Sequence, residues 1–344
     1  MRPKDPVTGR YPGGPTRRRL LPAVLAAIAL AFVAVALVAR RQPVSTIPRL
    51  VLAVGSTFVP VVAVTALILA VASRRILLSI LAVFLLAITV AVQATWYYVA
   101  RPTDVGAHAN VRVLSSNLRY GRADPVFFVA LAKSSADVIT VAELTREAVG
   151  RFNQAGIAET FPHSLLVPAP GPGGIGLWSR YPLTPLSAPR HRGVQMPAAR
   201  LQIPGVAHDP VLASAHIMSP VSDRQNTVED WRNGMAGAKA QLNDFAAAAG
   251  PGAVIVGGDY NSTPDMRQFR DLLTDGYHDA VEQTGSGFAP TYPSDTWFPP
   301  VITIDHVLTR NAVAASVMTI EMPGSDHRSL LATIEVPLAP AAPG

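Results

Sequence analysis

The segment Val254–Pro264 combines residue types and a spacing that could act on a phosphate group. An apolar run of three residues leads into two glycines, which are followed by Asp259 and Asn261. Residues two apart on an extended segment share a face, so this carboxylate and this amide would point into one site. They could serve there as a general base and as a hydrogen-bond donor to phosphate. An Asp/Asn turn after a strand produces the same pattern without catalysis, so the segment alone leaves both interpretations open.

Two further acid and imidazole combinations lie near the C-terminus. Asp326 and His327 directly precede an apolar segment, Leu330–Val336, that predicts a strand. Asp305 lies within the apolar run Val301–Leu308, which predicts another strand. A carboxylate buried inside such a strand is costly unless it has a partner. We expect the partner to be His327, with Asp305 orienting its imidazolium.

Three more polar residues follow predicted strands. They are Asn117 after the strand that begins at Val111, Glu143 after the strand Asp137–Val141, and His216 at the end of the strand Val211–His216. Six predicted strands thus each carry a residue able to handle phosphate, which is the layout of an active site on one sheet edge. His306 alternates with Asp305, so we expect it to point to the opposite face and to be structural.

The elements that must position these residues alternate between strand and helix. Asp124-Pro125 predicts a helix start, with the helix continuing to about Lys133, and helical spacing of apolar residues predicts a second helix over Thr227–Ala249. The remaining predicted strands are Ser164–Val167, Gly174–Ser179, Ala199–Ile203, Ala253–Gly257 and Ser316–Ile320. About ten strands with several helices indicate a sheet-rich α/β or α+β domain.

Taken in order, these segments resemble the endonuclease/exonuclease/phosphatase superfamily, the family of DNase I and the exonuclease III type nucleases. The matching positions are Asn117, Glu143, Gly174–Arg180, His216, Gly258–Asn261, Ile304–His306 and Ser325–His327. The similarity spans residues 108–337. It implies a four-layer α/β/β/α sandwich in which two β-sheets pack face to face between helices.

The resemblance also implies a role for each site residue. Glu143, Asp326 and Asn117 would build a Mg²⁺ or Mn²⁺ site, and Asp259 would orient or deprotonate the attacking water. Asn117, Asn261 and His216 would contact the substrate, His216 and His327 would stabilise developing charge, and Asp305 would hold His327. The chain has no cysteine, so any metal ligands must be oxygen or imidazole, which suits these hard cations.

Three apolar stretches precede this domain, at residues 20–39, 50–72 and 76–100. Each reaches the ~20 residues needed to cross a bilayer as a helix, and none contains a charge. Arg17–Arg19 resemble the start of a signal peptide, but the apolar stretch that follows is too long and two further spans come after it. Gly55 and Pro60 interrupt the second stretch.

Charge is distributed unevenly along the chain. The first 100 residues contain 11 Lys/Arg and one Asp, so their net charge is +10. The formal net charge of the whole chain is +6, so the remaining residues have a net charge of −4. The high isoelectric point therefore does not indicate nucleic-acid binding. With the N-terminus in the cytoplasm, eight of the cations near the spans lie inside and four outside, which favours an extracytoplasmic catalytic domain.

These patterns predict a multi-pass cell-membrane protein. Its parts would be a basic cytoplasmic tail at 1–19, a membrane anchor of about three helices at 20–100, a linker at 101–110, a catalytic domain at 111–338 and a tail at 339–344. The predicted function is divalent-metal-dependent hydrolysis of a phosphodiester or phosphomonoester. The acidic balance after residue 100 favours a lipid headgroup or small phosphoester over nucleic acid. A non-catalytic tethered binding or scaffolding domain and an extracytoplasmic nuclease remain alternatives, and no protein partner is predicted.

Overall fold

The computed structural model describes residues 15–101, 103–187, 189, 191–221 and 227–339. Most of the predicted N-terminal tail and nearly all of the predicted C-terminal tail lie outside these residues. The chain forms two compact units. Unit 1 comprises Met1–Val38 and Phe58–Val92, and unit 2 comprises Ala39–Thr57 and Gln93–Gly344.

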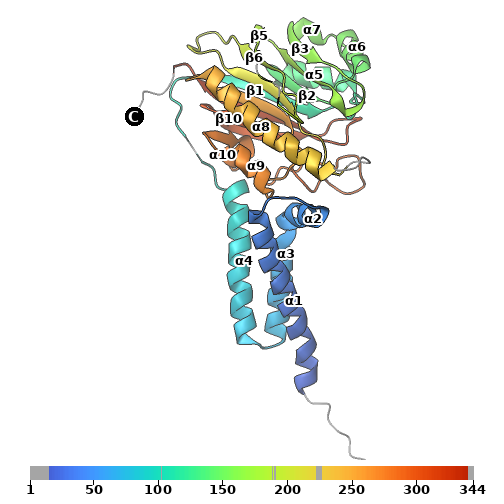
Figure 1. Cartoon of the computed structure of the whole chain (residues 1–344), viewed down its shortest axis with the longest axis vertical. Helices are drawn as coiled ribbons and strands as arrows, with labels where there is room; N and C mark the ends of the chain where they lie inside the picture. The colour runs from blue at the N-terminus through green and yellow to red at the C-terminus, as the bar shows by residue number, and fades with distance from the viewer. Residues whose placement is uncertain (1–14, 102, 188, 190, 222–226, 340–344) are drawn as a thin grey trace, which may run out of the picture. The chain divides into compact units, whose positions relative to one another are not determined.

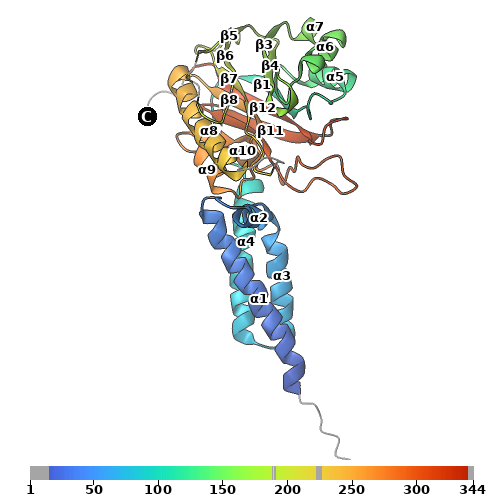
Figure 2. The same cartoon turned by 45° about the vertical axis from the view of Figure 1, so that its right-hand side comes forward.

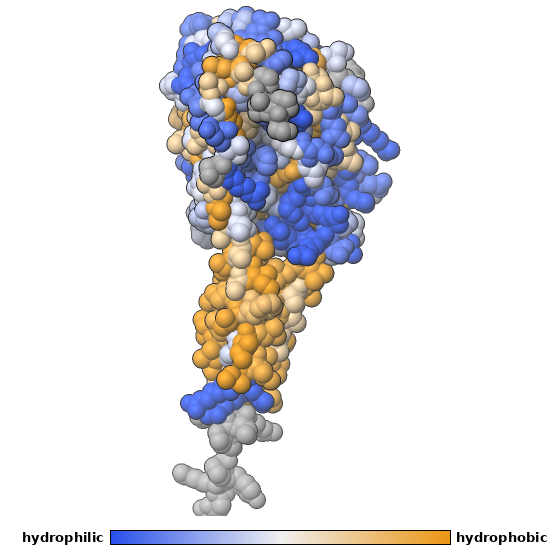
Figure 3. All heavy atoms as spheres, turned by 90° about the vertical axis from the view of Figure 1, so that its left-hand side faces the viewer, coloured by the Kyte–Doolittle hydropathy of each residue, from blue (hydrophilic) through white to orange (hydrophobic). Residues whose placement is uncertain are grey.

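Unit 1 is built from apolar helices. The candidate membrane spans are Arg19–Arg41, Ile47–Ala72 and Ile76–Tyr97, each long and apolar enough to cross a bilayer. Small side chains fill the interior of the unit: Ala26, Ala36, Ala63, Ala66, Ala70 and Ala82 are buried. Large apolar side chains lie outside, among them Ile28, Phe32, Val61, Ile68, Leu77, Ile80 and Phe84. This arrangement suits lipid as the solvent, and Figure 3 shows a nearly continuous apolar surface on one face of the unit.

The second candidate span is divided where Gly55 and Pro60 interrupt the apolar run. Helix α1 covers Pro15–Arg41, and it is followed by a short helix α2 at Ile47–Gly55. A 3₁₀ turn at Ser56–Phe58 leads into α3 at Val59–Ala72, and α4 covers Ile76–Tyr97. The 14 residues of α3 rise about 21 Å, less than a typical hydrocarbon core. α2 lies in unit 2.

Unit 2 contains two six-stranded sheets. The first has the order β11-β12-β1-β2-β4-β3, with strands Val313–Ile320, Ser329–Pro337, His108–Asn117, Val138–Ala142, Ile175–Ser179 and His163–Val167. The second has the order β5-β6-β7-β8-β10-β9, with strands Leu183–Pro185, Ala198–Leu201, Val211–His216, Val254–Asp259, Asp305–Arg310 and Tyr277–Asp279. Figures 1 and 2 show the two sheets packed face to face.

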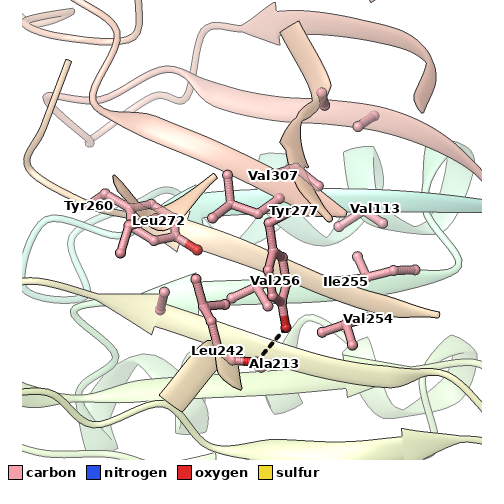
Figure 4. Packing of buried hydrophobic residues seen from close by; sticks show 14 of the residues in the cluster. Val113, Ala213, Leu242, Val254, Ile255, Val256, Tyr260, Leu272, Tyr277 and Val307 are labelled. Atoms are coloured by element: carbon pink, nitrogen blue, oxygen red, sulfur yellow. Dashed lines mark hydrogen bonds between the residues drawn. The ribbon is translucent and has the colours of Figure 1, made fainter. Parts of the chain in front are cut away.

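Helices cover the outer faces of both sheets, which confirms the predicted four-layer sandwich. They are α5 Pro125–Ser135, α6 Arg146–Gln154, α7 Ile157–Thr160, α8 Thr227–Ala249, α9 Arg267–Leu272 and α10 Ala280–Thr284. On the first sheet, Phe128 of α5 stacks on Phe152 of α6 with ring centroids 4.7 Å apart. On the second, the apolar stripe of α8, including Trp231, is buried. Figure 4 shows part of the core, where the Tyr277 hydroxyl donates to the Leu242 carbonyl of α8 at 2.6 Å.

The two sheets approach closely where β8 crosses the first sheet. A Cβ placed on Gly257 would lie 3.2 Å from the side chain of Ser115, and one on Gly258 would overlap the carbonyl oxygen of Ala215. The Ser214 hydroxyl also donates to the Val141 carbonyl across the sheets at 3.0 Å. The two glycines before Asp259 are therefore required by packing, because larger residues would push β8 away from its neighbours.

One predicted strand begins later than expected. The apolar pattern predicts a single strand over Val301–Leu308, but β10 begins only at Asp305. Ile302 instead forms an isolated bridge with Tyr292, whose loop crosses this part of the chain. Asp305 is thus the first residue of its strand and not an interior residue, because the loop from Tyr292 occupies the pairing position before it.

Candidate functional site

Three neighbouring strands of the second sheet bring His216, Asp259 and Asp305 to the same level. β7 runs parallel to β8 and pairs His216 with Asp259. β10 runs antiparallel to β8 and pairs Asp305 with the same Asp259. Side chains at paired positions of adjacent strands share a face and lie close together. The strand register therefore gathers these three residues at one edge of the sheet.

The first sheet supplies Asn117 and Glu143 to the same place. Asn117 ends β1 beside Ala142 of β2, and Glu143 directly follows β2. The amide Nδ2 of Asn117 donates to Glu143 Oε1 at 3.1 Å and to Asp259 Oδ2 at 2.9 Å. Its Oδ1 accepts from the backbone N–H of Arg119 at 2.9 Å. Asn117 thereby joins the acidic residues of the two sheets.

His327 forms an ion pair with Asp305, as the sequence predicts. The Nδ1 of His327 lies 2.8 Å from Asp305 Oδ2, and its Nε2 lies 3.9 Å from Asp259 Oδ2. Burial acts to lower the pKa of His327, but the charges of Asp305 and Asp259 outweigh it and raise the pKa to about 10. The buried ring is therefore an imidazolium at neutral pH.

Asp259 is buried among charges of both signs. Burial, and then the charge of Asp305, raise its pKa to about 6, while His327 and His216 act in the opposite direction. The backbone N–H of Asn261 donates to Asp259 Oδ1 at 2.8 Å, and the Asn261 amide lies 3.2 Å from Oδ2. The carboxylate is therefore fixed in orientation and sits close to the protonation equilibrium that a general base needs.

Backbone strain is concentrated at this edge of the sheets. Glu143 has φ +58° and Asn261 has φ +46°, both in the left-handed region that non-glycine residues rarely adopt. Arg119 and Tyr120, just after β1, have φ +46° and +53°. In this conformation the backbone N–H of Tyr120 donates to Glu143 Oε2 at 2.7 Å. Such conformations persist where the surroundings impose them and are common at active sites.

Asp326 points to a different partner from the other acidic residues. Its carboxylate lies 3.7 Å from Arg119 Nε, and Arg119 also pairs with Asp295 at 2.8 Å. Among the described residues, the acid and imidazole groups whose ligand atoms all lie within 4.8 Å are Asp259, Asp305 and His327, a buried group that could hold a metal ion. The structure thus joins Asn117, Glu143 and Asp259 in one network and places Asp326 beside Arg119.

His306 lies away from this network, as its alternation with Asp305 predicts. Its Nδ1 lies 2.7 Å from Asp279 Oδ2 and its Nε2 lies 2.9 Å from the Ser262 carbonyl oxygen. Both ring nitrogens are occupied and the side chain is buried, so His306 is structural.

Sequence patterns alone did not point to Arg119, Tyr120 or Tyr292. Arg119 faces Asp326, and the Tyr292 ring packs on His327 with centroids 4.9 Å apart. These residues lie in loops, where no periodicity marks them, and only the fold brings them to the site.

A pocket of about 230 Å³ opens beside His216. Its apolar lining comes from Pro172, Ile175, Val194 and Met218. An apolar pocket of this size could hold an uncharged group of a bound molecule.

Comparison with known proteins agrees with this geometry. Residues 107–327 match the model of the endonuclease/exonuclease/phosphatase family, which is more than half of the chain. The chain belongs to this family. No curated protein matches the chain.

Solved structures share the fold at low identity. Humanized D. rerio TDP2 has a TM-score of 0.52 at 17% identity, covering 65% of this chain and 98% of that one. An endonuclease/exonuclease/phosphatase from Bacteroides vulgatus has a TM-score of 0.52 at 15% identity, covering 66% and 99%. The 3'-5' exonuclease NExo from Neisseria meningitidis has a TM-score of 0.52 at 15% identity, covering 64% and 98%.

Proposed function

We propose that this protein is a membrane-anchored, divalent-metal-dependent phosphoesterase that hydrolyses its substrate by attack of water at phosphorus. The observation that carries this proposal is the environment of Asp259. This carboxylate is buried and held by Asn117 and Asn261, and it faces the imidazole rings of His216 and His327. A structural aspartate needs neither the raised pKa nor two histidines.

Asp259 acts as the general base that orients the attacking water and takes its proton. A base with a pKa near the working pH combines a useful basicity with a largely deprotonated population. The hydrogen bonds from Asn117 Nδ2 and Asn261 N fix its oxygens, so little reorientation is needed when the water is deprotonated.

His327 supplies positive charge to the oxygens of the phosphoryl group. Asp305 holds its Nδ1, which leaves Nε2 directed toward Asp259 and the site. His216 also interacts with the phosphoryl oxygens. Its Nε2 lies 3.8 Å from Asp259 and 3.9 Å from Glu143. Such preorganised donors are worth most where charge develops in the transition state.

The donor set fits Mg²⁺ or Mn²⁺. Glu143 and Asp259 both contact the amide of Asn117, so two carboxylates face one small volume with hard oxygen donors. Glu143 would hold the ion, Asn117 would join it through Oδ1 if the hydrogen bond from the Arg119 N–H opened, and Asp326 would join it if its pairing with Arg119 opened. A bound divalent cation would offset charge on the non-bridging oxygens of the substrate.

The proposal can be tested with the full chain purified in detergent. Hydrolysis of bis(p-nitrophenyl) phosphate should require Mg²⁺ or Mn²⁺ and should stop with EDTA. Asp259→Asn should lower kcat by about 10²–10⁴-fold, the usual effect of removing a general base. Asp275→Asn is the matched control, because that exposed carboxylate pairs with Lys239 outside the site. Metal-independent turnover, or an unaffected Asp259→Asn variant, would contradict the mechanism.

A nuclease is the second candidate. A D. rerio TDP2 structure of the same fold is complexed with single strand DNA product. This favours including a DNA substrate in any assay, although the acidic balance of residues 101–344 does not favour binding a polyanion. A binding or scaffolding domain without catalysis would be indicated if no phosphoester were hydrolysed with either metal.

A further inference from the structure

The pocket beside His216 shares one side chain with the candidate active site. His216 lines the pocket, and its Nε2 lies 3.8 Å from Asp259 Oδ2 and 3.9 Å from Glu143 Oε1. The His216 side chain is only 7% exposed, so it separates the pocket from the two carboxylates with little freedom to move. A group attached to a phosphate that contacts Asp259 and Glu143 would therefore lie beside the pocket.

The first wall of the pocket is attached to the segment that carries Glu143. Ile175 pairs with the last residue of β2, directly before Glu143. Directly after Glu143, the Leu144 N–H donates to the Gly174 carbonyl at 3.0 Å. A Cβ on Gly174 would overlap the Leu144 carbonyl oxygen, so the close approach of these two segments requires glycine at this position. Pro172 and Ile175, which line the pocket, are thereby fixed next to Glu143.

The second wall is packed on helix α8. Val194 lies in the loop between β5 and β6, and the next residue, Gln195, forms an isolated bridge with His216. A Cβ on Gly237 of α8 would lie 2.9 Å from Val194 Cγ1, and one on Gly234 would lie 3.0 Å from a carbonyl oxygen of the same loop. The two glycines thus let the loop lie against α8, and this packing fixes Val194 beside His216.

The size and lining of the pocket suit a compact apolar group. An apolar cavity of about 150 Å³ is large enough to bind benzene. This pocket has about 230 Å³, and Val194 and Met218 supply part of its apolar surface. Among the described residues that line it, Gln195 and His216 have polar side chains. A nucleobase has several donors and acceptors, which would lose water here without enough new partners, whereas an apolar group has none to lose.

We propose that this pocket is a substrate subsite for a compact, uncharged apolar group of about four to six carbons that is attached to the reacting phosphate. The inference rests on the proposed function and adds a specificity to it. Val194 and Met218 determine this specificity, because their side chains form part of the apolar surface that the group contacts. Both walls are already fixed by packing, so the group binds with little ordering of the protein.

The test measures binding separately from turnover. Methyl-, butyl- and phenylphosphonate each carry one organic group on a P–C bond that a phosphoesterase does not cleave. Their dissociation constants are measured by isothermal titration calorimetry with the full chain in detergent and Mg²⁺. Butyl- and phenylphosphonate should each bind at least about tenfold more tightly than methylphosphonate, because their additional carbons leave water for an apolar pocket.

Two variants show whether the pocket causes this preference. Val194→Asn places an amide in the pocket wall and should lower the preference for butyl- over methylphosphonate to about threefold or less. Met218→Gln, which keeps a long unbranched side chain, should act in the same direction. Val126→Asn is the matched control, because Val126 is 70% exposed on α5 and does not line the pocket. It should keep the wild-type preference, and methylphosphonate should bind all four proteins equally.

Three results would overturn this inference: no measurable binding of butyl- or phenylphosphonate, equal affinity for all three phosphonates, or a wild-type preference in both pocket variants. Hydrolysis of bis(p-nitrophenyl) phosphate in the same preparation is read independently. If that ester is hydrolysed and one of the three results is found, the proposed function stands without this subsite. If the preference and its loss in the variants are found but no ester is hydrolysed, the proposed function is contradicted instead.

Discussion

At the scale of residues, the site places the imidazole of His327 between the carboxylates of Asp305 and Asp259, and each group affects the pKa of its neighbours. The charge of Asp305 raises the pKa of both of its neighbours, to about 6 for Asp259 and to about 10 for His327, and the higher value places the proton on the imidazole. The two carboxylates face each other across β8 and β10, an arrangement that would be unfavourable without the histidine between them. The ordering of protons therefore depends on Asp305 more than on any other residue.

Asp305→Asn should shift the alkaline limb of the pH profile to lower pH. The protonated form of His327 is the active one, so wild-type activity should fall as pH rises through about 10. Removing the Asp305 charge removes the main influence that raises this pKa, so activity should be lost at a lower pH. The measurement is kcat/KM against pH with a soluble phosphodiester. Asp275→Asn is the control, and an alkaline limb that stays in place would show that His327 is not the titrating group.

The raised pKa of Asp259 should also be visible in stability. Its folded pKa of about 6 exceeds the ordinary value of 3.8, so folding favours the neutral form and stability falls as pH rises from about 4 to 6. In metal-free protein, Asp259→Asn should therefore raise Tm at pH 7.5. The difference should shrink as pH falls below 6 and vanish only below about pH 3.8, where the carboxyl is neutral in both the folded and the unfolded protein. A lower Tm for the variant at pH 7.5 would mean that its contacts with His216 and His327 dominate.

At the scale of elements, strand register explains why the sequence predicted so much of the site. His216, Asp259 and Asp305 end or begin strands that are neighbours in the second sheet, so each could be found from the strand that carries it. Arg119 and Tyr292 could not be found in this way, because loops place them. The short elements β5, β9, α7 and α10 also gave no signal, since three to five residues contain too few repeats of a pattern.

The double glycine before Asp259 gives a prediction at this scale. Gly258→Ala should lower the free energy of unfolding by about 1–3 kcal/mol, because its Cβ would overlap the Ala215 carbonyl and separate β7 from β8. The variant should also lose activity under conditions where it is still folded, because the separation of the two strands moves His216 away from Asp259. Gly150→Ala is the matched control: no atom lies within 4 Å of its new Cβ, and it should stabilise α6 by about 0.5–1 kcal/mol. Equal behaviour of the two variants in thermal unfolding and turnover would refute this packing role.

At the scale of the whole molecule, the chain contains two kinds of packing, one suited to lipid and one suited to water. Unit 1 buries mostly alanine, with a few larger side chains such as Leu30 and Val33, and exposes many large apolar side chains, whereas unit 2 buries most of its large apolar side chains. Hydropathy predicted the three apolar segments because it measures this difference directly. It could not predict that Arg40 would bind Asp265, because a contact 225 residues apart in sequence is set by the tertiary fold.

The distribution of cations predicts the side of the membrane on which the catalytic domain lies, and this prediction can be tested directly. Eight cations near the spans against four favour a cytoplasmic N-terminus, and three crossings then place residues after Arg101 outside. Because the chain has no cysteine, single substitutions report on one position each. Met318→Cys, on exposed β11, should react with a membrane-impermeant maleimide in intact cells. Arg75→Cys, in the turn between α3 and α4, should react only after the membrane is opened. The reverse labelling pattern would place the domain in the cytoplasm.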